Sequence, residues 1–142
     1  MKTIVVEGKT EYIVLQALFP QLATNGITIR VAYGFSNVFS LSRALIDYGM
    51  ETLIILDTDS NILGHDNRVV LQRIDSSVFI GREMNIVWMD PCIELVLHKV
   101  IPEIRHLRKS DNREIRTVIS QNRETILDLE EFKKIEEFIN NV

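Results

Sequence analysis

The sequence predicts an α/β fold in which a four-stranded parallel sheet is sandwiched by helices. Short, β-branched, apolar segments alternate with longer segments whose apolar residues recur at helical spacing. The strand segments are largely apolar, which is typical of strands buried on both faces of a parallel sheet. The segments between them are long enough to be helical crossovers. Such sheets bind ligands at the carboxyl ends of their strands, so the residues that follow each strand are the most informative about function.

The expected elements follow in chain order. The strands are expected at residues 3–6, 27–32, 52–56 and 85–89. The helices are expected at residues 10–22, 36–48, 67–82 and 91–100. Ser36 or Asn37 can cap the second of these helices, and Gly49 is expected to end it. Pro91 is expected to open the fourth, because proline is favoured in a first helical turn.

The rest of the chain is expected to be a helical extension. Apolar residues between Leu129 and Val142 recur on one helical face, with Asp128 as the expected cap. This pattern predicts a terminal helix docked on the core. We therefore divide the chain into a core, residues 1–100, and a helical extension packed on that core, residues 101–142.

Composition restricts the class of protein. The chain has 142 residues, of which 46% are hydrophobic, and these values suit one folded domain rather than a disordered chain. Its one cysteine cannot form an internal disulfide, and no segment resembles a signal peptide or a membrane span. We therefore expect a cytoplasmic protein without membrane contact. The net charge of -4 argues against a wholly basic nucleic-acid coat but leaves room for a local basic patch.

Four carboxylates are placed to meet at the carboxyl edge of the predicted sheet. Glu7 follows the first strand, and Glu11 lies one turn into the next helix. Asp57 and Asp59 follow the third strand. If these two strands are neighbours, the four side chains converge and repel one another, and a hard divalent cation resolves that repulsion. The pattern predicts a site for one or two Mg²⁺ or Mn²⁺ ions, which could activate water for phosphodiester hydrolysis.

Each half of this pattern also has a plainer interpretation. Glu7 and Glu11 alone would be ordinary solvated acids at a helix start, and residues 57–61 alone would be a turn or a helix cap. Their combination on two strand ends favours the metal site. The loop after the first strand is not a P-loop, because Thr3 stands where the Walker pattern needs a glycine.

Basic residues offer two places for a phosphate. The ammonium group of Lys9 and the adjacent helix N-terminus at Thr10 suit a phosphate beside the carboxylates. A basic segment, residues 99–123, is the best candidate for contact with a nucleic-acid backbone, since arginine suits phosphate. The residues expected to bind there are Arg105, Arg108, Lys109, Arg113 and Arg116.

The order and spacing of these motifs resemble the Toprim domain family. Glu7-Gly8-Lys9-Thr10-Glu11 follows one strand, and Asp57-Thr58-Asp59 follows another about fifty residues later. Toprim domains occur in topoisomerases, bacterial primases, small rRNA-maturing nucleases and the overcoming-lysogenization-defect (OLD) nucleases. The second glutamate of the first motif is most similar to the OLD-like branch. The resemblance covers roughly residues 2–100.

The resemblance implies a role for each matching residue. Glu7 would be a metal ligand or a general acid/base. Asp57 and Asp59 would hold Mg²⁺, and Glu11 would help to hold a second ion. Glu94 sits where the OLD-like branch often places a further acidic residue.

The expected function is a metal-dependent phosphodiester hydrolase that acts on DNA or RNA, with catalytic roles for Glu7 and Lys9. Two alternatives remain open. The small size and Asn61, where topoisomerase-like members often carry a further acid, also suit a non-enzymatic Toprim-like binding module. The chain could instead be a subunit of a larger nucleic-acid-processing complex, with a protein partner or a second copy of itself.

Overall fold

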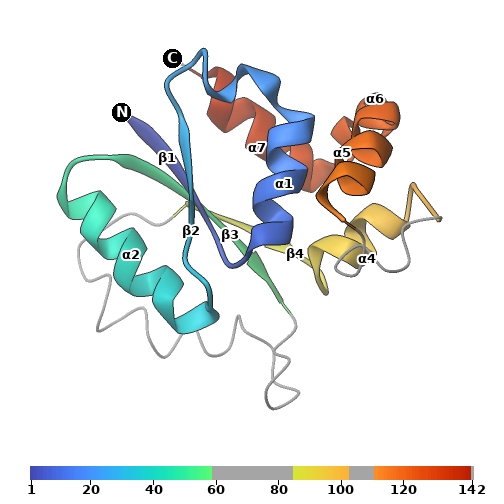
Figure 1. Cartoon of the computed structure of the whole chain (residues 1–142). Helices are drawn as coiled ribbons and strands as arrows, with labels where there is room; N and C mark the ends of the chain where they lie inside the picture. The colour runs from blue at the N-terminus through green and yellow to red at the C-terminus, as the bar shows by residue number, and fades with distance from the viewer. Residues whose placement is uncertain (59–84, 103–110, 142) are drawn as a thin grey trace.

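The computed structural model describes residues 1–58, 85–102 and 111–141. Its centre is a sheet of four parallel strands in the order β2-β1-β3-β4 (Figure 1). The strands are β1 (Lys2–Val6), β2 (Thr28–Val31), β3 (Glu51–Asp57) and β4 (Asn85–Met89). This confirms the predicted four-stranded parallel sheet, and it makes β1 and β3 neighbours, as the predicted metal site requires.

Helices cover both faces of the sheet (Figure 1). The described helices are α1 (Lys9–Leu18), the short 3-10 helix η1 (Pro20–Leu22), α2 (Phe35–Asp47), α4 (Ile93–His98), α5 (Asn112–Gln121), α6 (Arg123–Leu127) and α7 (Glu130–Asn140). One face of the sheet packs on α2, and the opposite face packs on α1, α4, α5, α6 and α7. The predicted helix at residues 67–82 lies outside the described residues.

The position of β1 and β3 in the middle of the sheet explains why their sequences are largely apolar. Ile4 and Val6 point into the larger core cluster, whereas Val5 points to the face covered by α2. The same alternation continues in β3, where Leu53 and Ile55 face one side and Ile54 faces the other. Because successive strand residues point to opposite faces, a strand buried on both faces is apolar at most of its positions, and the buried Thr3 of β1 is hydrogen-bonded to Thr28.

Four predicted helix ends were wrong. The second helix, α2, begins at Phe35 with Gly34 as its N-cap, so neither Ser36 nor Asn37 caps it. The first helix stops at Leu18 because Pro20 follows, and the residue before a proline avoids the helical conformation. Pro91 lies before α4 rather than in its first turn, since Cys92 is the N-cap in extended conformation. Asp128 ends α6, and Leu129 is the N-cap of α7.

The C-terminal helices share the main hydrophobic core with the sheet. Phe132 and Ile135 of α7 are fully buried in the same cluster as Ile4 of β1. Polar contacts join the same regions: Lys2 Nζ donates to Phe138 O at 2.7 Å and also to Asn141 O. The division into a core at residues 1–100 and an extension at 101–142 remains a prediction. Within the described parts of the chain, no helix is both long enough and apolar enough to cross a membrane.

Candidate metal centre

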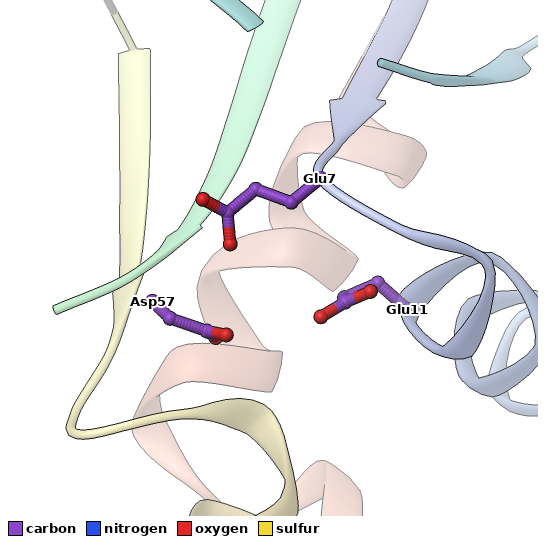
Figure 2. A group of neighbouring side chains, drawn as sticks. All are labelled: Glu7, Glu11 and Asp57. Atoms are coloured by element: carbon purple, nitrogen blue, oxygen red, sulfur yellow. The ribbon is translucent and has the colours of Figure 1, made fainter. Parts of the chain in front are cut away.

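Three carboxylates meet at the carboxyl edge of the sheet. Glu7, Glu11 and Asp57 each offer an oxygen, and these oxygens lie within 4.8 Å of one another. Figure 2 shows the three side chains converging from three separate segments: the end of β1, the first turn of α1 and the end of β3. The structure therefore brings together three of the predicted metal ligands.

The fold brings these residues together through strand register and helix spacing. β1 and β3 are paired in parallel, with Val6 opposite Ile55, so both strands end at the same edge. Glu7 directly follows β1, and Asp57 is the last residue of β3. Glu11 lies one helical turn beyond Glu7, so its side chain returns to the strand end from which α1 starts.

Gly8 leaves the space that the Glu11 carboxylate occupies. A Cβ atom at position 8 would lie only 3.1 Å from Glu11 Oε2. The Gly8 backbone has φ −144°, an extended conformation open to any residue, so a glycine is not needed for its backbone angles. Its importance is the close approach of Glu11, which is itself only 4% exposed.

Asp57 is held by the first turn of α4. The backbone amide of Ile93 donates to Asp57 Oδ1 at 3.1 Å, in a buried position. Thr58 strengthens the same junction, because its amide donates to Met89 O at 3.0 Å and its hydroxyl donates to Asp90 Oδ1 at 2.7 Å. The end of β3 is thus tied to the loop that leads into α4.

The donor set fits a hard divalent cation. Glu11 and Asp57 are buried, and Glu7 is half-buried, so water screens their charges only in part. A bound cation removes both the repulsion between the carboxylates and part of the cost of burying their charge. An all-oxygen carboxylate set is the kind that Mg²⁺ and Mn²⁺ prefer over softer metals.

Cys92 lies beside this group, at the N-cap of α4. Burial is the main cause that raises the pKa of its thiol above the ordinary value, and the nearby charges of Asp57 and Glu94 raise it further. The backbone amides of Leu95 and Glu94 act in the opposite direction without reversing the shift. A thiol with a raised pKa is protonated at neutral pH, which disfavours Cys92 as a nucleophile.

The other predicted site residues do not belong to the group of three carboxylates. Glu94 lies half-buried in the first turn of α4 but is not part of the three-carboxylate group, and Lys9 is exposed at the start of α1. Arg116 on α5 contacts α1 instead of the carboxylates, since its Nη2 donates to Gln16 Oε1 at 3.3 Å. Arg113 is exposed on the same helix. The remaining predicted ligand and the remaining basic residues lie outside the described part of the chain: Asp59, Arg105, Arg108 and Lys109.

Two features of this edge were not predicted from the sequence. The first is the junction of Thr58 with Asp90, which depends on β3 and β4 being neighbours. The second is Tyr33, which lies in the loop after β2 and is 73% exposed. Its sequence signal was an aromatic residue followed by glycine just after a strand, at the edge where ligands bind.

Comparisons with known proteins agree with this architecture. Residues 1–59 match the family model for the overcoming lysogenization defect (OLD) protein-like TOPRIM domain. The solved C-terminal region of the Burkholderia pseudomallei OLD protein is 19% identical with a TM-score of 0.55, over 98% of this chain and 81% of that chain. The corresponding region of the Xanthomonas campestris pv. campestris OLD protein is 19% identical with a TM-score of 0.52, over 98% of this chain and 79% of that chain. No curated protein sequence matches this chain.

The family model covers the segment that contains β1, α1, β2, α2 and β3, and therefore Glu7, Glu11 and Asp57. The solved structures agree with the arrangement of nearly the whole chain. The resemblance to the OLD-like branch of the Toprim family is thus confirmed as a similarity: residues 1–59 match the OLD-like TOPRIM family model, and the chain has the fold of the C-terminal regions of OLD proteins.

Proposed function

We propose that this protein is a metal-dependent phosphodiester hydrolase that acts on DNA or RNA. The observation that carries the proposal is the meeting of Glu7, Glu11 and Asp57 from three separate segments, with oxygens within 4.8 Å of one another. Buried carboxylates at this distance are costly unless a cation is bound. The Toprim resemblance supports a nuclease in particular, because this family includes nucleases with acidic metal-binding residues.

The proposed role of each carboxylate follows from how deeply its side chain is buried. Glu11 and Asp57 are buried and serve as metal ligands, and Asp59 and Glu94 are proposed as further ligands. Glu7 is half-buried, so it can both bind metal and exchange a proton with a water or a leaving oxygen. When bound, one or two Mg²⁺ or Mn²⁺ ions supply a water of lowered pKa and neutralise charge on the phosphate.

Positive groups on this chain are proposed to hold the substrate. Lys9 is exposed two residues after Glu7, where its ammonium group can reach a phosphate beside the carboxylates. Arg113 and Arg116 on α5, with Arg105, Arg108 and Lys109, are proposed as contacts for a longer stretch of the nucleic-acid backbone. Such contacts depend on salt, because binding to phosphates releases counterions.

The test compares cleavage by the wild type with cleavage by Asp57→Asn. The asparagine keeps an oxygen that can accept from the Ile93 amide, but it lacks the charge that a cation needs. Labelled single-stranded and duplex DNA and RNA are incubated with Mg²⁺ or Mn²⁺, with a chelator as the negative control. We expect the wild type to cut at least one of these substrates and Asp57→Asn to lose at least about a hundredfold in rate, typical of losing an essential charged group.

The matched control is Glu51→Gln, which makes the same kind of change at the opposite end of the same strand. Glu51 is exposed and begins β3, whereas Asp57 ends it. We expect Glu51→Gln to cut like the wild type. Cleavage that persists in Asp57→Asn, or that needs no divalent cation, would refute the proposal.

A further inference from the structure

Tyr33 stands out among the aromatic residues because it is exposed at the edge of the sheet where the carboxylates meet. Its side chain is 73% exposed, while most large apolar side chains in the described residues are buried. Tyr33 lies in the loop between β2 and α2, and β2 is the direct neighbour of β1, which ends before Glu7. In Figure 1 this loop, at the start of α2, lies at the same edge of the sheet as the start of α1, although the two helices cover opposite faces.

The backbone around Tyr33 is bonded directly to the backbone around Glu7. Ala32 N donates to Val6 O at 2.9 Å, and Gly34 N donates to Glu7 O at 3.2 Å. Tyr33 is the residue between these two donors. Its ring is therefore carried by a loop whose position is fixed relative to the metal ligands.

The conformation of Tyr33 is one that few side chains adopt. Its φ is 57°, in the left-handed region, which costs a residue with a Cβ atom roughly 1 kcal/mol or more. Asn37 Nδ2 donates to Tyr33 O at 3.3 Å and helps to hold this turn. A glycine or an asparagine would meet the backbone requirement at lower cost. A tyrosine that is both strained and exposed contributes little to folding, and this favours a role for its ring in binding.

We propose that Tyr33 stacks on an unpaired base of the substrate, so that the substrate is single-stranded or locally unpaired nucleic acid. This inference rests on the proposed function, because a phosphodiester held at the carboxylates carries its neighbouring bases to the same edge. An exposed aromatic face binds any base by stacking, whereas a base inside a duplex is already stacked and paired. Lys9, exposed at the start of α1, supplies a positive charge for the phosphate that joins such bases.

The experiment measures kcat and KM for cleavage, with Mn²⁺ present throughout. The substrates are twelve-nucleotide oligothymidine or oligouridine strands, the same strands in duplex form, and a strand of equal length made of tetrahydrofuran abasic residues, whose sugar rings carry no base. Tyr33→Asn removes the ring but tolerates the left-handed backbone. Tyr33→Phe keeps the ring. Tyr48→Ala is the matched control, because Tyr48 is 87% exposed at the other end of α2.

The expected result separates stacking from other roles. Tyr33→Asn raises KM about fivefold or more on the base-bearing single strand, as loss of one stacking contact predicts, and leaves KM on the baseless strand unchanged. Tyr33→Phe and Tyr48→Ala behave like the wild type, and the wild type prefers single strands to duplex.

Three results would overturn the inference while the proposed function stands. They are unchanged kinetics in Tyr33→Asn, an equal loss on the strands with and without bases, and a wild type that cuts only duplex. A wild type that cuts none of the substrates refutes both proposals. A partner protein that binds at Tyr33, in place of a base, would give unchanged kinetics in Tyr33→Asn.

Discussion

Asp57 accepts a hydrogen bond from the backbone amide of Ile93, with Oδ1 3.1 Å from the nitrogen. This contact joins the end of β3 to the first turn of α4, and it orients a carboxylate that also belongs to the candidate metal centre. Asp57 thus has a structural role and a proposed ligand role. Substitution by alanine and substitution by asparagine should affect these two roles differently, so the two variants distinguish the structural role from the ligand role.

Asp57→Ala should be less stable than Asp57→Asn by about 1–3 kcal/mol in the absence of metal. Alanine leaves the buried Ile93 amide without its acceptor, whereas asparagine keeps an oxygen in place. Urea unfolding followed by circular dichroism, with a chelator present, gives the two free energies of unfolding. Equal stability of the two variants would contradict the structural role assigned to this hydrogen bond.

Gly8→Ala should weaken Mn²⁺ binding several-fold with little change in stability. The new methyl group would start 3.1 Å from Glu11 Oε2, so the buried carboxylate must move away from its present position. The backbone of residue 8 is extended and accepts alanine without strain. Titration calorimetry measures the affinity, and Gln16→Ala, an exposed change later on α1, is the control that should bind Mn²⁺ as the wild type does. Unaltered affinity in Gly8→Ala would mean that Glu11 has room to adjust.

Cys92 should react slowly with iodoacetamide at pH 8 in the folded protein and faster after unfolding in urea. Its pKa is raised above the ordinary value of a cysteine, mainly by burial, and only the thiolate is alkylated. The folded state binds this proton more tightly than the unfolded state. The stability that this difference contributes is therefore present below the ordinary pKa of a cysteine and is lost as the pH rises through the raised pKa of the folded state. Mass spectrometry follows the alkylation, and faster reaction in the folded protein would contradict the direction of the shift.

Phe132→Ala should lower the free energy of unfolding by about 3–5 kcal/mol, the usual cost of removing a large buried aromatic side chain. Phe132 of α7 is fully buried in the cluster that contains the sheet residues Ile4 and Ile55. The neighbouring exposed residue provides the control, because Lys133→Ala should change stability by less than about 0.5 kcal/mol. A small effect of Phe132→Ala would show that the C-terminal helices are not integral to the core.

The sequence was sufficient to predict the sheet and most of the carboxylate group. Buried parallel strands have a clear apolar pattern, and Glu7 and Glu11 are related by one helical turn, so only the adjacency of β1 and β3 remained to be shown. The resemblance to the Toprim family rests on these same motifs, in their order and spacing.

Other features depend on contacts between distant parts of the chain, and local patterns do not contain them. The bond from Ile93 to Asp57 requires the loop after β4 to fold against the end of β3. The conformation of Tyr33 depends on its neighbours bonding to β1 and Glu7. Helix ends were misplaced for a related reason: the residues around Pro91 are also favourable in a first helical turn, and only the tertiary structure decides where α4 begins.

The most direct test of the central claim is a crystal of the wild-type protein soaked in millimolar Mn²⁺ and measured for anomalous scattering. We expect a manganese peak among the carboxylate oxygens of Glu7, Glu11 and Asp57, at about 2.0–2.2 Å from at least two of them. We also expect the peak to disappear in Asp57→Asn. An anomalous map with no peak between these three residues, or with manganese bound only elsewhere on the chain, would contradict the proposed metal site.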